Sequence, residues 1–273
     1  MAERETGDVT MSGEELQYPD DFVQRLETIW GNGFLSPGGP EEVGEIVKGV
    51  ALAGQHVLDI GCGTGGPAIV LTRDLGAAHV TAIDIEAPLL TRAEQNAQEA
   101  HVAAKTTFQL VEPGPLPFPD GTFDIVFSKD ALIHIEDKAA LYRDVLRVLR
   151  PGGIFVASDW LGGENTENSP EFAKFRDLGH LKFAMATGEE TATVMRRAGF
   201  TEVATRDRNA WYAKLSQFEY EQIAGPLREQ LIEAVGEDVH SHWIKVRRAL
   251  ADATAVGALR PTHLRGVKPA IAT

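Results

Sequence analysis

Two acidic residues, each close to the end of a short apolar run, frame a glycine-rich segment of the chain. Asp59 stands just before the segment Gly-Cys-Gly-Thr-Gly-Gly at residues 61–66, and Asp84 ends the next apolar run. The order of strand, glycine loop, helix, strand and acid is typical of a nucleoside-binding α/β unit, because glycines let the backbone approach a ligand closely. The second acid can accept hydrogen bonds from both ribose hydroxyls. These residues therefore predict a bound nucleoside.

The glycine segment resembles motif I of the class I S-adenosylmethionine (SAM)-dependent methyltransferases. Residues 117–128 and 149–159 resemble later motifs of the same family, and Asp59 stands where the amino-acid end of SAM is expected. The resemblance implies an α/β, Rossmann-like fold with a mostly parallel seven-stranded sheet, helices on both faces and a helical lid or cap. It also implies SAM as the cofactor. The candidate cofactor-binding residues are Ser36, Asp59, Gly61, Gly63, Asp84, Ile85, Glu112 and Lys129.

Two other interpretations compete for the glycine loop. A dinucleotide-dependent dehydrogenase uses a similar loop, but the chain has no Tyr-x-x-x-Lys pair, which disfavours that class. The second is a doubly wound domain in which the acids only cap helices. Neither interpretation explains the series of later motifs.

A second segment carries a more specific resemblance. Residues 29–39 read Ile-Trp-Gly-Asn-Gly-Phe-Leu-Ser-Pro-Gly-Gly, and residues 128–134 read Ser-Lys-Asp-Ala-Leu-Ile-His. Both resemble blocks of the phosphoethanolamine N-methyltransferases and related small-amine methyltransferases. In that family a lid tyrosine and a motif histidine form a hydrogen-bonded dyad, and the resemblance carries these roles to Tyr18 and His134. It carries the role of a substrate-contacting carboxylate to Asp130.

The chain departs from this family where the substrate phosphate is bound. By approximate register, the positions of two tyrosines, an arginine and a lysine are taken here by Leu26, Phe183, Leu181 and Val246. Burying a dianion against such side chains carries a desolvation cost of several kcal/mol. We therefore expect the methyl acceptor to be the nitrogen of a small amine other than phosphoethanolamine. A neighbouring cation could still supply charge: Lys182, Lys245, Arg247 or Arg248.

Two alternatives remain open for the function: O- or C-methylation of a small natural product, and SAM binding without catalysis. Methyl transfer is an in-line displacement that needs a nucleophile held about 3–3.5 Å from the methyl carbon and a proton acceptor. The pKa range of histidine suits His134 to that role. The competing structural roles are a helix cap for His134, packing for Tyr18 and an N-cap for Asp130. Five aromatic residues could form a cage for a methylated ammonium, although packing in the core is the stronger expectation: Trp30, Phe34, Trp160, Phe183 and Trp211.

Composition excludes several classes of protein. The formal net charge of −14 over 273 residues argues against a nucleic-acid partner, which would need a basic surface. The single cysteine, Cys62, cannot form an intrachain disulfide, and no apolar run reaches membrane-spanning length, so we expect a cytoplasmic protein without membrane contact. The spacing of His240 and His242, which read as a helix end, does not make a metal site, and we expect no metal. The oligomeric state stays undetermined.

Patterning along the chain divides it into four parts. We expect a disordered tail at residues 1–14, lid helices within 15–52, a SAM-binding core at 53–159, and cap helices with the last strands at 160–273. Helices are predicted at residues 22–30 and about 40–52. The core is expected to run strand, helix, strand, helix, strand, helix, strand. Later elements are predicted as cap helices over 165–185 and 211–235, a helix that ends at Gly199, a strand at 201–208 and an antiparallel edge strand at 263–267.

Overall fold

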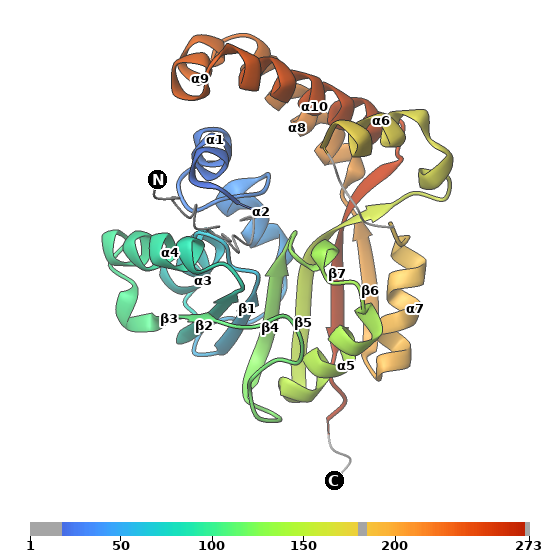
Figure 1. Ribbon diagram of the computed structural model, residues 1–273. Helices are drawn as coiled ribbons and strands as arrows, with labels where there is room; N and C mark the ends of the chain where they lie inside the picture. The colour runs from blue at the N-terminus through green and yellow to red at the C-terminus, as the bar shows by residue number, and fades with distance from the viewer. Residues whose placement is uncertain (1–17, 180–184, 271–273) are drawn as a thin grey trace, which may run out of the picture.

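A seven-stranded sheet runs through the centre of the molecule, and the computed structural model describes residues 18–179 and 185–270 of it (Figure 1). The strand order is β3-β2-β1-β4-β5-β7-β6. The strands are β1 (His56–Ile60), β2 (His79–Asp84), β3 (Thr106–Leu110), β4 (Phe123–Lys129), β5 (Leu149–Gly162), β6 (Thr201–Asp207) and β7 (Leu259–Val267). The first five strands are parallel to one another, and β7 is antiparallel to both β5 and β6. The predicted fold class is therefore confirmed.

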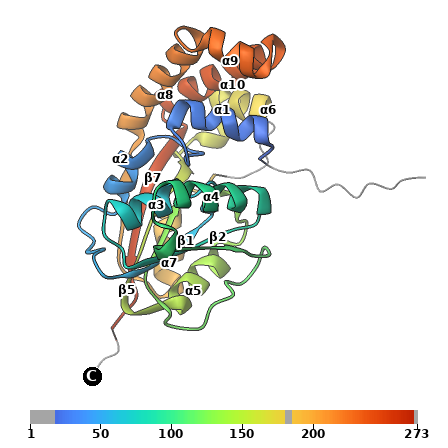
Figure 2. The same ribbon diagram turned by 90° about the vertical axis from the view of Figure 1, so that its left-hand side faces the viewer.

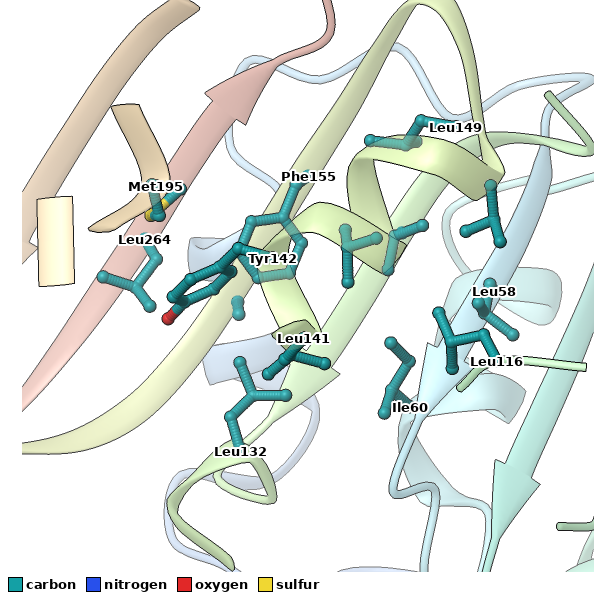
Figure 3. Packing of buried hydrophobic residues seen from close by; sticks show 14 of the residues in the cluster. Leu58, Ile60, Leu116, Leu132, Leu141, Tyr142, Leu149, Phe155, Met195 and Leu264 are labelled. Atoms are coloured by element: carbon teal, nitrogen blue, oxygen red, sulfur yellow. The ribbon is translucent and has the colours of Figure 1, made fainter. Parts of the chain in front are cut away.

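Helices cover both faces of the sheet because each central strand buries side chains on both sides. Val57 packs with α2 (Gly39–Ile46), α3 (Gly66–Arg73) and α4 (Ala87–Glu99) on one face. Leu58 and Ile60 point to the opposite face and pack with α5 (Lys138–Val148) and α7 (Gly188–Ala198). Figure 3 shows this second cluster, with Tyr142 and Phe155 stacked edge to face at 5.8 Å. Burial on both faces explains why these strands read as continuous apolar runs.

A helical layer lies over the carboxyl ends of the parallel strands (Figures 1 and 2). It consists of α6 (Pro170–Gly179), α8 (Asn209–Ala224), α9 (Arg228–Val235) and α10 (Glu237–Ala255), together with α1 (Asp20–Trp30) from the start of the described chain. Leu26 of α1 packs against Ile223, Leu231 and Trp243 of this layer. The ligand-binding edge of the sheet thus faces a lid made from both ends of the sequence.

Three predictions for single elements are confirmed. The helix over 22–30 is α1, the helix that ends at Gly199 is α7, and the strand over 201–208 is β6. The prediction for the last strand is partly wrong: β7 is antiparallel but lies inside the sheet, and β6 forms the edge. The side chains of β6 are largely exposed, as expected of an edge strand.

Several other predictions need correction. The helix predicted over about 40–52 ends at Ile46, close to Gly49, whose φ is +79°. The predicted core order lacks one strand, because β3 and β4 follow each other through a proline-rich loop without an intervening helix. The cap segment 211–235 is broken at Gly225 and Pro226 into α8 and α9. His240 and His242 belong to the start of α10, which the sequence patterns did not reveal. In the described residues of the 165–185 segment, the helical elements are a short 3-10 turn (Thr166–Asn168) and α6.

Candidate active site

The glycine segment forms a tight turn between β1 and α3. The backbone N–H groups of Gly61 and Cys62 both donate to the carbonyl of Ile83, at 2.9 and 3.0 Å, which joins the turn to the end of β2. Gly61 has φ +72°, and a Cβ atom there would lie 2.3 Å from the Cβ of Ala131. Glycine is thus required both by the backbone conformation and by the close approach of the turn that follows β4.

Asp84 at the end of β2 organises the same turn. One carboxylate oxygen accepts the N–H of Gly63 at 2.9 Å, and the other accepts the N–H groups of Ile85 and Glu86 at 2.8 and 3.1 Å. Burial raises the pKa of Asp84, and these backbone donors only partly offset it. Ile85 beside it leaves 53% of its surface exposed, although it is a large apolar residue. An acid next to an open apolar surface fits a ribose with an attached base.

A cavity of about 840 Å³ opens in front of this turn. Seven of the eight predicted cofactor-binding residues line it: Ser36, Gly61, Gly63, Asp84, Ile85, Glu112 and Lys129. The predicted catalytic residues Tyr18, Asp130 and His134 line it too. The folding of four separate strand ends and the lid loop thus brings nearly all of the predicted residues to one cavity.

Asp59 is the predicted residue that does not line this cavity. Its side chain is 1% exposed, and neither carboxylate oxygen has a hydrogen-bond partner among the described residues. Burial, and then the charge of Asp84, raises the pKa of Asp59 to about 8. A buried carboxyl without a partner is costly, so its position directly behind the glycine turn fits a cationic group that reaches it from the ligand.

Lys129 connects the lid loop to the sheet. Its ammonium donates to the hydroxyl of Ser36, to the carbonyl of Pro37 at 2.8 Å and to Asp130 at 3.0 Å. Asp130 also accepts a hydrogen bond from Ser158 at 2.6 Å. Burial raises the pKa of Asp130, but Lys129 and Ser158 outweigh it and hold that pKa below its usual value. Asp130 is therefore a buried carboxylate whose charge Lys129 already balances.

The surroundings of Tyr18 raise its pKa, whereas those of His134 lower its pKa. Burial, together with the charges of Asp84, Glu86 and Asp130, raises the pKa of Tyr18 to about 12, so the hydroxyl keeps its proton. Burial and the nearby charge of Lys138 lower the pKa of His134, and Asp84 partly opposes them. His134 closes a 3-10 turn, η2 (Leu132–His134), whose Leu132 carbonyl accepts a hydrogen bond from Lys138. A neutral imidazole can accept a proton, and a protonated phenol can donate a hydrogen bond.

A second cavity of about 660 Å³ adjoins the first under the helical lid. Five residues line both cavities: Tyr18, Leu35, Ser36, Asp130 and His134. The predicted catalytic residues therefore lie at the junction of two spaces. This arrangement allows one molecule in each cavity to meet at a single reacting atom.

The comparisons with known proteins address which family builds such a site. Residues 58–157 match the methyltransferase domain family model. The 27-O-demethylrifamycin SV methyltransferase of Amycolatopsis mediterranei is 31% identical over 234 residues, which cover 79% of this chain and 84% of that protein. The chain belongs to the class I SAM-dependent methyltransferases. The prediction made from the motif residues is thus confirmed for the family.

Other relatives of this methyltransferase match over a smaller share of their length. Phosphoethanolamine N-methyltransferase 1 of Arabidopsis thaliana is 31% identical over 213 residues, which cover 77% of this chain but only 42% of that protein. The solved structure of phosphoethanolamine N-methyltransferase 2 from Haemonchus contortus, bound to phosphomonomethylethanolamine and S-adenosylhomocysteine, superposes with a TM-score of 0.83. At 24% identity over 93% of this chain and 59% of the other, it supports the fold.

The five aromatic residues that the sequence suggested for an ammonium cage do not surround one common space. Trp160 and Trp30 line the second cavity, whereas Phe34 lines the first and Trp211 lines neither. The guanidinium of Arg208 lies 4.5 Å from the ring of Trp211, and that of Arg247 lies 5.2 Å from Trp30. Phe183 is outside the described residues. The expected packing role therefore holds for Trp211, and two of these rings already carry an arginine of the methyltransferase itself.

Two of the four positions expected to lack phosphate-binding groups lie within the described residues. Leu26 and Val246 line the second cavity, while Leu181, Lys182 and Phe183 lie outside the described residues. Arg247 also lines it, but its charge is paired with Glu219. Lys245 and Arg248 are exposed and line neither cavity.

Sequence reasoning missed one residue of the methyltransferase that joins the lid to the glycine turn. The buried carboxylate of Glu27 accepts hydrogen bonds from the N–H of Gly33 and the hydroxyl of Thr64, both at 2.9 Å, and lies 2.7 Å from Arg92. An acid on the same helical face as Val23 and Trp30 is the signal that could have revealed it, since a buried acid needs partners.

The described residues offer neither a metal site nor a membrane-spanning helix. Within residues 18–179 and 185–270, no group of three or more His, Cys, Asp or Glu side chains is placed to hold a metal ion. His240 instead lies 3.1 Å from the carbonyl of Ile223 inside the cap. No helix in the described part of the chain is long and apolar enough to cross a membrane.

Proposed function

We propose that this protein transfers the methyl group of SAM, bound in the first cavity, to a small molecule bound in the second. The observation that carries the proposal is that Tyr18, Asp130 and His134 line both cavities. Asp84 would hold the ribose hydroxyls and the glycine turn the amino-acid portion of the cofactor. When bound, SAM supplies an electrophilic methyl group on a sulfonium ion.

The chain's own residues would supply positioning and a proton acceptor. His134 would take the proton of the nucleophile, because its lowered pKa keeps the imidazole neutral near pH 7. Tyr18 would donate a hydrogen bond that orients His134, and its raised pKa keeps that proton in place. Asp130 would accept a hydrogen bond from the methyl acceptor. The lid would exclude water from the junction.

The sequence predicts a small amine other than phosphoethanolamine as acceptor, and O- or C-methylation of a natural product as the alternative. The apolar residues Leu26 and Val246 in the second cavity support the exclusion of a phosphate ester. The same cavity also favours the alternative over a small amine, since it is spacious and apolar side chains make up most of its lining. A SAM-binding protein without catalysis would need no second cavity at this junction.

Transfer of a labelled methyl group from SAM tests the proposal. A set of amines and phenols would be incubated with the wild-type protein and analysed by mass spectrometry. His134→Ala should lower turnover by about 10²–10⁴ if His134 accepts the proton. Tyr18→Phe should impair turnover but leave SAM affinity nearly unchanged. Rapid turnover of phosphoethanolamine would contradict the exclusion of that substrate, and unchanged turnover in His134→Ala would contradict the role of His134.

A further inference from the structure

The second cavity has a size, a lining and a charge distribution that restrict what it can bind. We propose that the methyl acceptor is an uncharged, multi-ring aromatic hydroxyl compound, and that methylation occurs on its phenolic oxygen. This inference rests on the proposed function, because it assumes that the second cavity is the acceptor site. It goes further by excluding small ammonium compounds as the preferred substrates.

Size is the first argument. The second cavity measures about 660 Å³ against about 840 Å³ for the first, so it is about four-fifths as large. A small amine of a few heavy atoms occupies on the order of 100 Å³, judged from about 30 Å³ for a water molecule. Such an amine would leave most of the cavity filled with water. Binding sites of this volume are typical of drug-sized ligands.

The lining supplies the second argument, because it is built mainly from rings and aliphatic side chains. Aromatic residues come from four separate elements: Phe22 and Trp30 from α1, Trp160 from β5, Phe175 from α6 and Trp243 from α10. Ile133, Leu178, Val246 and Leu250 fill the spaces between them. Flat aromatic ligands gain the most from such walls, since offset and edge-to-face ring contacts add to the burial of apolar area.

Charge is the third argument, and it opposes an ammonium group. The guanidinium of Arg25 lies 5.3 Å from the ring centre of Phe22 and 5.7 Å from that of Trp243. Arg247 lies 5.2 Å from Trp30. Three of the five rings, those of Phe22, Trp30 and Trp243, thus already lie near an arginine. Asp130, the carboxylate at the junction, is already 3.0 Å from Lys129. A cationic acceptor at the junction would therefore meet a carboxylate that is already balanced; Arg25, the Glu219-paired Arg247 and Asp238 line the rest of the cavity.

The reaction that follows is balanced in charge and in bonds. The phenolic oxygen would face the junction, where His134 takes its proton on a ring nitrogen. The oxygen then forms a bond to the methyl carbon, the carbon–sulfur bond breaks, and its electron pair stays on sulfur. The products are a neutral aryl methyl ether and S-adenosylhomocysteine, and His134 releases its proton to solvent. No further reactant is needed.

Binding to the complex with S-adenosylhomocysteine tests this inference separately from turnover. Calorimetric titration would compare 1-hydroxyanthraquinone with ethanolamine, and 2-naphthol with 2-naphthylmethylamine, which has the same ring system but is cationic at pH 7. We expect the phenols to bind at least about tenfold more tightly than their amine counterparts. Labelled methyl transfer should give the ether of the three-ring phenol.

Filling the far part of the cavity provides the matched variants. Val246→Trp places an indole in the cavity, and Val239→Trp does so at its rim, where Val239 is 40% exposed. Each should weaken binding of 1-hydroxyanthraquinone by roughly tenfold or more, since an overpacked site costs 1–3 kcal/mol, and leave S-adenosylhomocysteine binding unchanged. Val256→Trp, at a 57% exposed position that lines neither cavity, is the control and should change nothing.

The possible failures are distinguishable. If S-adenosylhomocysteine does not bind to the wild-type protein, the proposed function itself is wrong. A different set of results would overturn only the inference about the acceptor: S-adenosylhomocysteine binds, the phenols do not bind, and small amines are bound and methylated equally well in Val246→Trp and Val239→Trp. The proposed function would then stand. Preferred binding of 2-naphthylmethylamine over 2-naphthol would also overturn it.

Discussion

Burial shifts the pKa values of the two members of the proposed dyad in opposite directions: it raises that of Tyr18 and lowers that of His134. It favours the neutral imidazole of His134 and the neutral phenol of Tyr18, so one group is a proton acceptor and the other a hydrogen-bond donor over the neutral pH range. Asp84 opposes this effect at His134, and Lys138 reinforces it. The charges around the junction therefore set the pKa of His134 and, if His134 is the proton acceptor, the pH at which turnover begins.

The pH dependence of turnover should report the opposing effects of Asp84 and Lys138 on the pKa of His134. If His134 accepts the proton, activity needs its neutral imidazole, and kcat should rise with pH through a pKa below 6.5 and become constant by about pH 7.5. Lys138→Met removes a positive charge and should move the profile to higher pH. Lys105→Met, at an exposed position remote from the site, is the control. An unshifted profile in Lys138→Met would show that another group controls the rate.

Asp59 should reduce the stability of the protein without ligand. Its pKa is about 8 in the folded state against 3.8 in the unfolded chain, so stability falls as the pH rises through this window. Asp59→Asn removes this cost and should stabilise the ligand-free protein at pH 7 by on the order of 1–4 kcal/mol. Chemical denaturation measures the change. If Asp59 also receives the cationic end of SAM, the same variant should bind SAM more weakly.

At the scale of elements, the lid helix α1 depends on one buried carboxylate. Glu27 connects α1 to Gly33 of the lid loop, to Thr64 of the glycine turn and to Arg92 of α4. Gly66 of the same turn donates its N–H to the carbonyl of Gly33 at 2.9 Å. Movement of α1 must therefore disturb the cofactor turn, and a cofactor that orders the turn should also order the lid.

Glu27→Gln tests this coupling. The variant keeps the size of the side chain but loses its charge, which should cost about 1–3 kcal/mol, the usual range for hydrogen bonds to charged groups. Hydrogen exchange should become faster in residues 20–39, and the affinity for SAM should fall by a similar free energy. Glu233→Gln, on exposed α9, is the matched control and should change neither. Faster exchange in α1 with unchanged SAM affinity would argue against the coupling.

At the scale of the whole molecule, α1 from the first part of the chain and the cap helices from its second half lie together over one edge of the sheet (Figure 2). They pack in one cluster that includes Leu26 and Trp243, and residues of both line the second cavity. Residues from the lid, three strands and the turn after β4 line the first cavity. A ligand bound there would contact them at the same time and should therefore stabilise the molecule as a unit.

Thermal unfolding measures that stabilisation. Saturation with S-adenosylhomocysteine at about one hundred times its Kd contributes about 2.7 kcal/mol, which corresponds to an increase in Tm of roughly 5–10 °C for a chain of this size. Asp84→Ala should weaken binding by about 1.5–3 kcal/mol and abolish most of the shift at the same ligand concentration. A full shift in that variant would mean that Asp84 does not hold the ligand.

The sequence by itself determined the family and predicted most of the residues that converge on the first cavity. Short-range patterns carry this information: the glycine turn follows β1 directly, and Asp84, Lys129 and Asp130 stand at strand ends that parallel pairing brings to one edge. Once the strand order is that of a doubly wound sheet, these residues must converge. Their identities and spacing were therefore sufficient.

Only the tertiary structure decided the acceptor side and the sheet's far edge. The insertion of β7 between β5 and β6, the buried position of Asp59, the role of Glu27 and the arginines on Trp30 and Trp243 all depend on contacts between segments far apart in the sequence. The cap helices have no motif, and their apolar residues read alike whether they face a core or a ligand. The physical reason is that burial and charge pairing there are set by packing across the chain, which local patterns do not encode.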